Sequence, residues 1–275
     1  MSTLKHLALC PRGGLGNRLR AIASARRIGE LFQVRCTVVW AWGNYDELFL
    51  PAAGTDWIPA LTSEMKRWPC VSHLLTRDGG NEQNRRVSLS LGENVVVCSH
   101  YPFNATEEPG FIDETQVQPW LPQPAEVIRA KVRDFKEAHL HNAVGIHMRR
   151  ADNKKAKRGT PEALYFAEAE RALGLGYRIF LATDKEQTAA LMKERYGDRL
   201  ITYPKTSNLK RRWPRPFRLV DTIDDIVDLH LLAACQFVIG SRYSSFSRLA
   251  ALYNGSPLCS MLPCEPTASA LPPAS

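Results

Sequence analysis

The chain has 275 residues, of which 44% are hydrophobic and 23% are charged. These fractions exclude an intrinsically disordered chain, and the length favours two compact domains. No stretch contains the roughly 20 apolar residues of a membrane-spanning helix, so we expect a cytoplasmic protein without an integral membrane segment, with peripheral membrane contact left open. The net charge of +8 predicts an anionic partner, which could be nucleic acid, an anionic membrane or a phosphorylated small molecule.

Seven cysteines are scattered along the chain without a C-x-x-C pair. Their odd number and their spacing argue against a disulfide framework and against a zinc site. Cys10, Cys36, Cys98 and Cys235 stand in apolar stretches, and we interpret them as small buried side chains.

The N-terminal half predicts a strand, a glycine-rich turn, a helix and further strands. In chain order we expect a strand at 6–10, a turn at 11–17, a helix at 19–32, and strands at 36–42 and 95–98. Between 44 and 94 the pattern is less regular. Residues 102–124 contain several prolines and are interpreted as a linker or a loop over a cleft.

From residue 127 the chain alternates between helical and strand patterns. We expect helices at 127–139, 161–173, 186–196, 222–234 and 246–253, and strands at 143–148, 177–183, 200–203, 236–240 and near 257. This alternation is typical of parallel βαβ units in a doubly wound sheet. We therefore predict an α/β fold with an N-terminal α/β domain over 1–124, a Rossmann-like domain over 125–262 and a loose tail over 263–275.

The segment 145–152, with the sequence GIHMRRAD, places a histidine and two arginines at the end of a predicted strand. Because strand side chains alternate between faces, His147 and Arg149 share one side of the sheet and the alternate residues pack into the core. The planar guanidinium of Arg149 suits a pair of phosphate oxygens. The alternative is a structural strand end in which an arginine forms an ion pair with Asp152.

A buried strand pattern at 237–240 runs into a hydroxyl-rich turn that contains Ser244 and Ser245, and a helix follows. The first N–H groups of a helix lack partners and carry the positive end of its dipole, so they bind anions. Ser244 and Ser245 could donate hydrogen bonds to a phosphate at this place. They could equally be helix N-caps and nothing more.

Acidic residues gather in the helix expected at 222–234. Asp224 and Asp228 are four residues apart and therefore share a face of that helix. One carboxylate accepts two parallel hydrogen bonds from the N1–H and 2-amino groups of guanine, which makes such an aspartate a candidate nucleoside ligand. Acidic residues near a helix start also complement the helix dipole, and the sequence leaves both interpretations open.

The turn after the first strand contains Gly14, Gly16 and Asn17. Glycines there permit a tight turn and a close approach of the backbone to a ligand. The turn is a poor dinucleotide fingerprint, because Leu19 stands where the third glycine is needed, and it lacks the Gly-Lys-Ser/Thr of a Walker loop.

Two basic stretches, 154–158 and 205–218, are interpreted as loops. In isolation each indicates a polyanion contact or simply a solvated face. The sequence contains no nucleic-acid motif such as an aromatic RNP strand, so we do not expect nucleic acid as a partner.

Taken together and in this order, the motifs resemble the superfamily of α1,6-fucosyltransferases, rhizobial nodulation fucosyltransferases and protein O-fucosyltransferases. The resemblance is specific over 145–257 and weak between 44 and 124. The residues that carry it are His147, Arg149, Arg150 and Asp152, then Ala182, Thr183 and Asp184, then Asp228, His230, Ser244 and Ser245, and in the N-terminal turn Gly14, Gly16 and Asn17.

The resemblance implies a GT-B fold, in which two Rossmann-like domains face a cleft. It also implies GDP-fucose as the donor, inversion at the anomeric carbon, and no metal or other cofactor. It assigns Arg149 to the β-phosphate, Ser244 and Ser245 to the support of that phosphate, and His147 and Asp228 to the nucleoside. The donor site that it implies further includes Arg150, Asp184, Gly14, Gly16 and Asn17.

The catalytic base is expected shortly after the arginine motif, where family members carry a carboxylate. The candidates in this chain are Glu162, which the inserted basic stretch displaces, and Asp152, which could instead orient an arginine. A second departure is Lys185, which stands where α1,6-type members commonly carry a further Asp.

These observations favour an inverting, metal-independent glycosyltransferase that moves fucose from GDP-fucose to a glycan or glycolipid acceptor. The first alternative is a transferase for another GDP-sugar on the same scaffold, because the motifs address GDP more than the sugar. The second is a basic nucleic-acid-binding protein, whose binding would depend steeply on salt.

Overall fold

The computed structural model describes residues 4–41, 45–73, 86–88, 90–108, 114–150, 154–205, 223–256 and 259–262. Asp152 and the tail 263–275 lie outside these ranges, as does the basic stretch from 206 onward. The described residues up to Glu126 form one compact unit, and those from Val127 on form a second. Within these ranges no helix is both long and apolar enough to cross a membrane.

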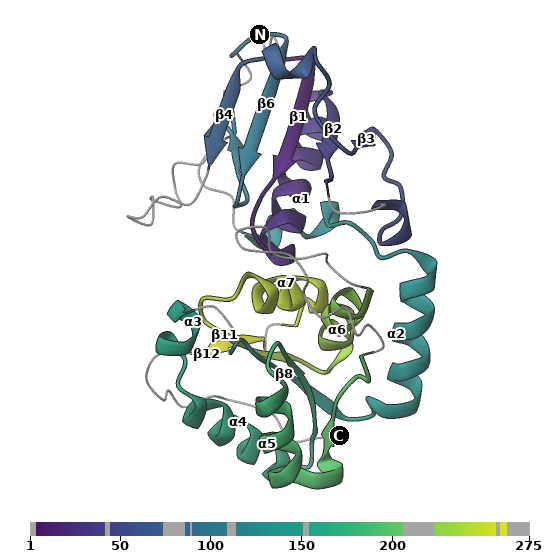
Figure 1. The fold of residues 1–275 in the computed structure, drawn as a ribbon, viewed down its shortest axis with the longest axis vertical. Helices are drawn as coiled ribbons and strands as arrows, with labels where there is room; N and C mark the ends of the chain where they lie inside the picture. Colours follow the sequence, from purple (N-terminus) through teal and green to yellow (C-terminus); the bar gives the residue numbers. More distant parts are fainter. Residues whose placement is uncertain are drawn as a thin grey trace. The chain divides into compact units, whose positions relative to one another are not determined.

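The first unit is built on a five-stranded parallel sheet with the order β3-β2-β1-β6-β4. Helix α1 (Leu15–Phe32) packs against the sheet through a largely buried face (Figure 1). The short strands β3 and β4 fall in the stretch 44–94 and contain too few residues to show a clear alternation. The strands are β1 (His6–Pro11), β2 (Arg35–Val39), β3 (Thr55–Ile58), β4 (Cys70–His73) and β6 (Asn94–Ser99).

Short elements complete the first unit: η1 (Tyr45–Glu47), η2 (Met65–Arg67), β5 (Arg86–Val87), β7 (Asn104–Ala105) and η4 (Glu114–Trp120). The interpretation of 102–124 as a linker is therefore wrong for its described part. Arg26 of α1 donates to the carbonyl oxygen of Trp120 at 2.8 Å, and the Trp120 indole donates to Glu30 at 2.8 Å. These bonds hold η4 on α1, within the unit.

The second unit is a three-layer structure around a parallel sheet of order β10-β9-β8-β11-β12. Helices α4 and α5 cover one face, and α6 and α7 cover the other (Figure 1). The strands are β8 (Ala143–Met148), β9 (Arg178–Thr183), β10 (Leu200–Ile201), β11 (Val238–Ser241) and β12 (Ser260–Leu262). The helices are α2 (Glu126–His139), α3 (Lys154–Gly159), α4 (Glu162–Gly174), α5 (Glu186–Tyr196), η5 (Gly197–Arg199), α6 (Ile223–Ala234) and α7 (Ser245–Asn254).

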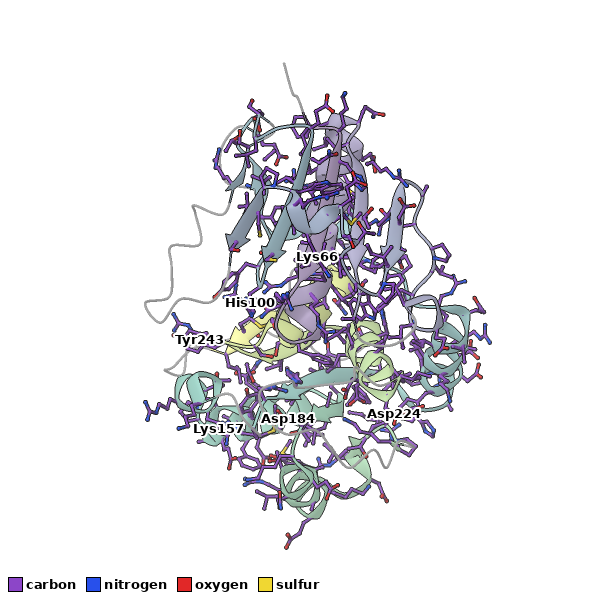
Figure 2. The ribbon with its side chains drawn as sticks, turned by 45° about the horizontal axis from the view of Figure 1, so that its top comes forward. Lys66, His100, Lys157, Asp184, Asp224 and Tyr243 are labelled. Carbon is purple, nitrogen blue, oxygen red and sulfur yellow. The ribbon has the colours of Figure 1, made fainter. Side chains whose placement is uncertain are left out.

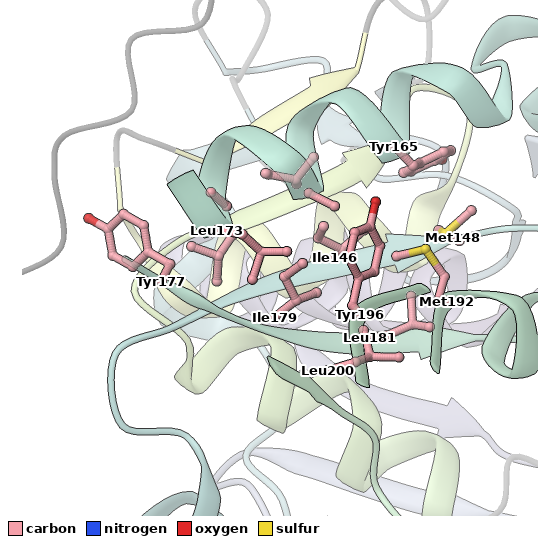
Figure 3. Packing of buried hydrophobic residues seen from close by; sticks show 14 of the residues in the cluster. Ile146, Met148, Tyr165, Leu173, Tyr177, Ile179, Leu181, Met192, Tyr196 and Leu200 are labelled. Carbon is pink, nitrogen blue, oxygen red and sulfur yellow. The ribbon is translucent and has the colours of Figure 1, made fainter. Parts of the chain in front are cut away.

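The central strand β8 is buried along its whole length and shows the expected alternation. Ile146 and Met148 join the apolar cluster beneath α4 and α5 (Figure 3). Gly145 faces α6, where an added Cβ would lie 3.1 Å from Leu232 Cδ2. His147 consequently points to the face covered by α6 and α7. It lies opposite Ile146 and Met148, as strand alternation predicts.

The interpretation of 154–158 as a loop is wrong, because these residues belong to helix α3. Ala156 is fully buried and anchors the helix. The guanidinium of Arg150 donates to the carbonyl oxygens of Lys157 at 3.4 Å and Thr160 at 2.6 Å, which satisfies two acceptors at the end of α3.

Candidate functional site

The topology of the second unit marks one place for a ligand. From β8 the chain proceeds to β9 and β10 on one side, and it then returns to β11 and β12 on the other side of β8. The strand order therefore reverses between β8 and β11, and doubly wound sheets bind ligands outside the carboxyl ends of the strands at such a point. Arg149 follows β8 directly, and Ser241 ends β11.

Arg149 is held at this point by its neighbours on both sides. Its backbone N–H donates to Ser241 Oγ at 3.1 Å. Its guanidinium Nη1 lies 2.8 Å from Asp184 Oδ2, with 26% of the arginine side chain exposed and 10% of the aspartate. Asp184 Oδ1 also accepts the backbone N–H of Arg150 at 2.7 Å. One carboxylate thus orients the partly exposed guanidinium of Arg149 and fixes the backbone of the next residue.

Arg150 is buried, in contrast to Arg149. Besides its bonds to the end of α3, its Nε lies 3.6 Å from Glu162 Oε1 and its guanidinium lies 5.0 Å from the centre of the Tyr165 ring. This geometry favours a role in holding α3 and α4 beneath the site, and contact of Arg150 with the donor stays a prediction.

Glu162, one of the two candidate bases, is the first residue of α4, and 49% of its side chain is exposed. Figure 2 labels Asp184 after β9 and Lys157 on α3.

His147 is buried under the start of α7. Its Nδ1 lies 2.6 Å from Ser247 Oγ, and its ring centre lies 4.8 Å from that of Phe246. Burial, assisted by the charge of Arg149, lowers the pKa of His147 to about 3. The imidazole is therefore neutral at physiological pH and serves as a hydrogen-bonding group.

The N-terminus of α7 lies at the same sheet edge. Ser244 is the N-cap, and its side chain accepts the N–H of Ser247 at 3.4 Å, so the capping interpretation is confirmed for this residue. Ser247 Oγ in turn accepts the N–H of Ser241 at 3.0 Å. Ser245 is the first helical residue and is partly exposed. The start of α7 is thereby fastened to the end of β11, with its first N–H groups at the carboxyl edge.

Close packing between α7 and β11 depends on Gly240. A Cβ at this position would lie 2.4 Å from Ser247 Cβ and 2.8 Å from Met261 Sδ. We expect Gly240→Ala to lower the free energy of unfolding by about 1–3 kcal/mol, since displacing Ser247 breaks its bonds to the strand end. Gly174→Ala is the matched control, because a Cβ there meets nothing within 4 Å. Urea unfolding of both variants measures the difference, and equal stability would contradict the packing argument.

Asp228 lies on α6 and is 4% exposed. Lys205 Nζ lies 2.8 Å from its Oδ2. Burial raises the pKa of Asp228 to about 6, although Lys205 favours the charged form. Asp224, one turn earlier, is also buried. His230 of the same helix packs with its ring centre 4.6 Å from that of Tyr253, and burial lowers its pKa to about 4.

The glycine-rich turn lies in the first unit. Gly14 is the N-cap of α1, Gly16 lies in the first turn of that helix, and Asn17 Oδ1 accepts from Arg20 at 3.0 Å. The residue that requires glycine is Gly13, which has a φ of +84° and where an added Cβ would lie only 2.9 Å from His100 Cδ2. A contribution of this turn to the donor site of the second unit stays a prediction.

Sequence reasoning missed four polar residues that support the site, namely Thr160, Tyr165, Ser241 and Ser247. Tyr165 of α4 hydrogen-bonds through its hydroxyl to Ser241 Oγ. Thr160 Oγ1 accepts the N–H of Arg242 at 3.3 Å, and Ser247 joins His147 to β11. Tyr165 and Ser247 occupy helical positions that resemble ordinary core positions, so no sequence signal distinguishes them. Within the described ranges no group of three or more His, Cys, Asp or Glu side chains is arranged to hold a metal ion.

No protein-family model and no curated protein matches this sequence. Solved structures do match its fold. The fucosyltransferase NodZ from Bradyrhizobium gives a TM-score of 0.59 at 20% identity, over 90% of this chain and 92% of that one. POFUT1 in complex with GDP-fucose gives 0.56 at 12% identity, over 92% and 94% of the two chains. A variant of Arabidopsis thaliana FUT1 in complex with GDP gives 0.57 at 14% identity, over 92% of this chain and 69% of that one.

At these identities the likeness establishes the fold. The chain has the α/β architecture of the GT-B fucosyltransferases, with a parallel sheet in each of its two units. The fold class predicted from the motifs is confirmed, and the matched structures belong to the superfamily that the motifs resemble. The cleft between two domains and the roles of individual residues stay predictions.

Proposed function

We propose that this protein is a glycosyltransferase that moves fucose from GDP-fucose to a glycan or glycolipid acceptor. The observation that carries the proposal is the partly exposed Arg149, oriented by Asp184 at the strand-order reversal between β8 and β11. Proteins of the same fold have been crystallised with GDP and with GDP-fucose, namely NodZ and POFUT1.

The chemistry follows from the charges at this edge. The acceptor oxygen attacks the anomeric carbon opposite the diphosphate, the bond from that carbon to the β-phosphate oxygen breaks, and negative charge develops on the departing GDP. A fixed guanidinium and the N–H groups at the start of α7 stabilise that charge electrostatically. Arg149 and the turn with Ser244 and Ser245 fill these roles in our proposal. Attack from the opposite face inverts the anomeric centre, and no metal ion takes part in the proposed steps.

The nucleoside is assigned to Asp228, whose carboxylate would accept the N1–H and 2-amino groups of guanine. His147 is assigned to positioning helix α7 rather than to a direct contact with the nucleoside. Its buried, neutral ring is bonded to Ser247, so in our proposal it holds the start of α7 at the phosphate position.

The pH dependence of donor binding tests the role of Asp228. The carboxylate is ionised above its pKa of about 6 and protonated below it. A protonated carboxyl cannot accept both guanine donors, so donor affinity should fall by about tenfold for each pH unit below that pKa. The measurement is calorimetric binding of GDP-fucose, whose diester diphosphate does not titrate near pH 6. In Asp228→Asn the pH slope should vanish, and an unchanged slope would remove Asp228 from the nucleoside site.

Binding and turnover in the presence of EDTA test the function itself. We expect GDP to bind at least about tenfold more tightly than ADP, a difference of about 1.4 kcal/mol. We also expect hydrolysis of GDP-fucose, and transfer to a glycan acceptor, to continue in EDTA. Equal affinity for GDP and ADP would contradict the proposal. Faster turnover of another GDP-sugar than of GDP-fucose would instead retain the scaffold chemistry and change the donor.

A further inference from the structure

Three cysteines gather on one face of the sheet in the first unit. Cys10 of β1 and Cys98 of β6 are register partners in adjacent parallel strands. On the other side of β6, Cys70 of β4 is the partner of Val96, two residues before Cys98. Because alternate residues of a strand share a face, all three thiols point to the same side of the sheet.

The thiol of Cys98 is the centre of this cluster. The thiols of Cys10 and Cys70 and the guanidinium of Arg12, which follows β1, all interact with it electrostatically and lower its pKa. Cys10 is buried, Cys98 is partly exposed and Cys70 is exposed. The expectation that Cys98 is buried is wrong, because it is partly exposed at the carboxyl end of β6, although it packs against the apolar cluster that contains Cys10.

A pocket opens beside the cluster. It has a volume of about 220 Å³, and its lining includes Cys10, Arg12 and Lys66, the last from η2. Figure 2 labels Lys66 and, after β6, His100 in this unit. Two cationic side chains among the lining residues favour the entry of a small anion or polar oxidant.

The surroundings of the cluster favour the thiolate of Cys98 over that of Cys10. The interaction with the Cys10 thiol lowers the pKa of Cys98, burial opposes this effect, and the charge of Arg12 reinforces the lowering. The same interaction, together with burial, raises the pKa of Cys10. Burial also raises the pKa of Cys70. A thiolate with partial exposure beside a cation is the arrangement of reactive cysteines.

We propose that Cys98 is a peroxide-reactive thiol that forms a reversible intramolecular disulfide with Cys10. The Cys98 thiol gives up its proton, and its sulfur attacks one peroxide oxygen. An S–O bond forms, the O–O bond breaks, and the hydroxide released takes up that proton and becomes water. The Cys10 sulfur then attacks the sulfur of the Cys98 sulfenic acid, forming the S–S bond and expelling hydroxide, which takes the Cys10 proton. The two thiols lose two electrons, and one hydrogen peroxide becomes two waters.

Sheet geometry selects Cys10 over Cys70 as the resolving thiol. Register partners on adjacent strands have Cα atoms about 4.8 Å apart, within the range of about 4.4–6.8 Å in which disulfides form. Cys70 is offset from Cys98 by two residues, and such diagonal neighbours lie about 7–8 Å apart. A disulfide across that distance needs backbone movement. The proposal does not depend on the transferase activity.

Peptide mapping of the full-length protein after hydrogen peroxide tests the proposal. We expect wild type to lose the mass of two hydrogens and to yield a linked peptide pair that contains Cys10 and Cys98, with dithiothreitol reversing the change. Cys70→Ser is the matched control, because it removes a thiol of the same cluster and should still form the link. A linked pair containing Cys70, or no link at all, would overturn the assignment.

A second readout separates the reactive thiol from the resolving one. Cys10→Ser should leave a sulfenic acid at Cys98 that dimedone traps, whereas Cys98→Ser should show no adduct at Cys10. At pH 7, iodoacetamide should label Cys98 of the wild type about tenfold faster than the more exposed Cys70, because only the thiolate reacts. Slower labelling of Cys98 than of Cys70 would contradict the thiolate assignment. This comparison of labelling rates needs only the wild-type protein.

Discussion

Replacing Arg149 by alanine is expected to lower kcat for fucose transfer by about 10²- to 10³-fold, the scale of removing one preorganised donor to a developing oxyanion. The reason is its position at the strand-order reversal, where Asp184 fixes the guanidinium at 2.8 Å. The charge on the leaving GDP grows in the transition state, so kcat should fall more than donor affinity. Steady-state kinetics with GDP-fucose measure both quantities.

Two further variants make the result for Arg149 specific. Arg149→Lys keeps the charge and loses the planar fork, so we expect partial recovery of kcat. Arg195→Ala is the control, because Arg195 also pairs with a carboxylate, that of Glu170 at 3.0 Å, but lies on α5. It should leave transfer unchanged. Wild-type kcat in Arg149→Ala, or an equal loss in Arg195→Ala, would exclude the proposed role.

Glu162→Gln is expected to reduce transfer by about 10²- to 10⁴-fold while sparing donor binding, as the loss of a general base would do. Glutamine keeps the size of the side chain and its reach toward Arg150, at 3.6 Å in the wild type. It removes the ability to accept a proton from the acceptor hydroxyl. The measurements are transfer rate and donor affinity on the same preparation, with thermal unfolding to verify the fold.

Glu168→Gln is the matched control for the base. Glu168 lies on the same helix and also forms an ion pair with an arginine, Arg171. If both variants lose activity equally, the effect is structural. Normal transfer by Glu162→Gln would remove Glu162 from the role and leave Asp152 as the remaining candidate among the two carboxylates.

The second unit was largely predictable from sequence because its strands are long enough to carry a pattern. β8 and α5 occupy the ranges expected from periodicity. Helix α4 differs from expectation by a single residue at each end, and α6 begins one residue later than expected and ends where expected. The side of the sheet to which His147 points follows from strand alternation alone. In the first unit β3 and β4 escaped prediction, because four-residue strands punctuated by tryptophan and proline show no clear period.

The candidate site was predictable in its residues and less so in its contacts. Arg149 and Asp184 were both singled out, yet their pairing was not, because it depends on two strand ends lying side by side in the folded sheet. The sequence offered Asp152 as the partner, which is near in the chain. Likewise, Ser241 is unremarkable as a residue type, and only folding brings its hydroxyl to the backbone of Arg149 and to Tyr165.

The tether between Arg150 and α3 has a consequence for how this surface can be altered. The guanidinium bonds to main-chain carbonyl oxygens, those of Lys157 and Thr160, and these oxygens are present whatever side chains the helix carries. The attachment of α3 is therefore indifferent to the chemistry of its outward-facing positions. An engineer could replace the exposed Lys154 and Lys157 of this helix with acidic residues, or graft a binding epitope onto it, while the arginine beneath keeps the scaffold in place.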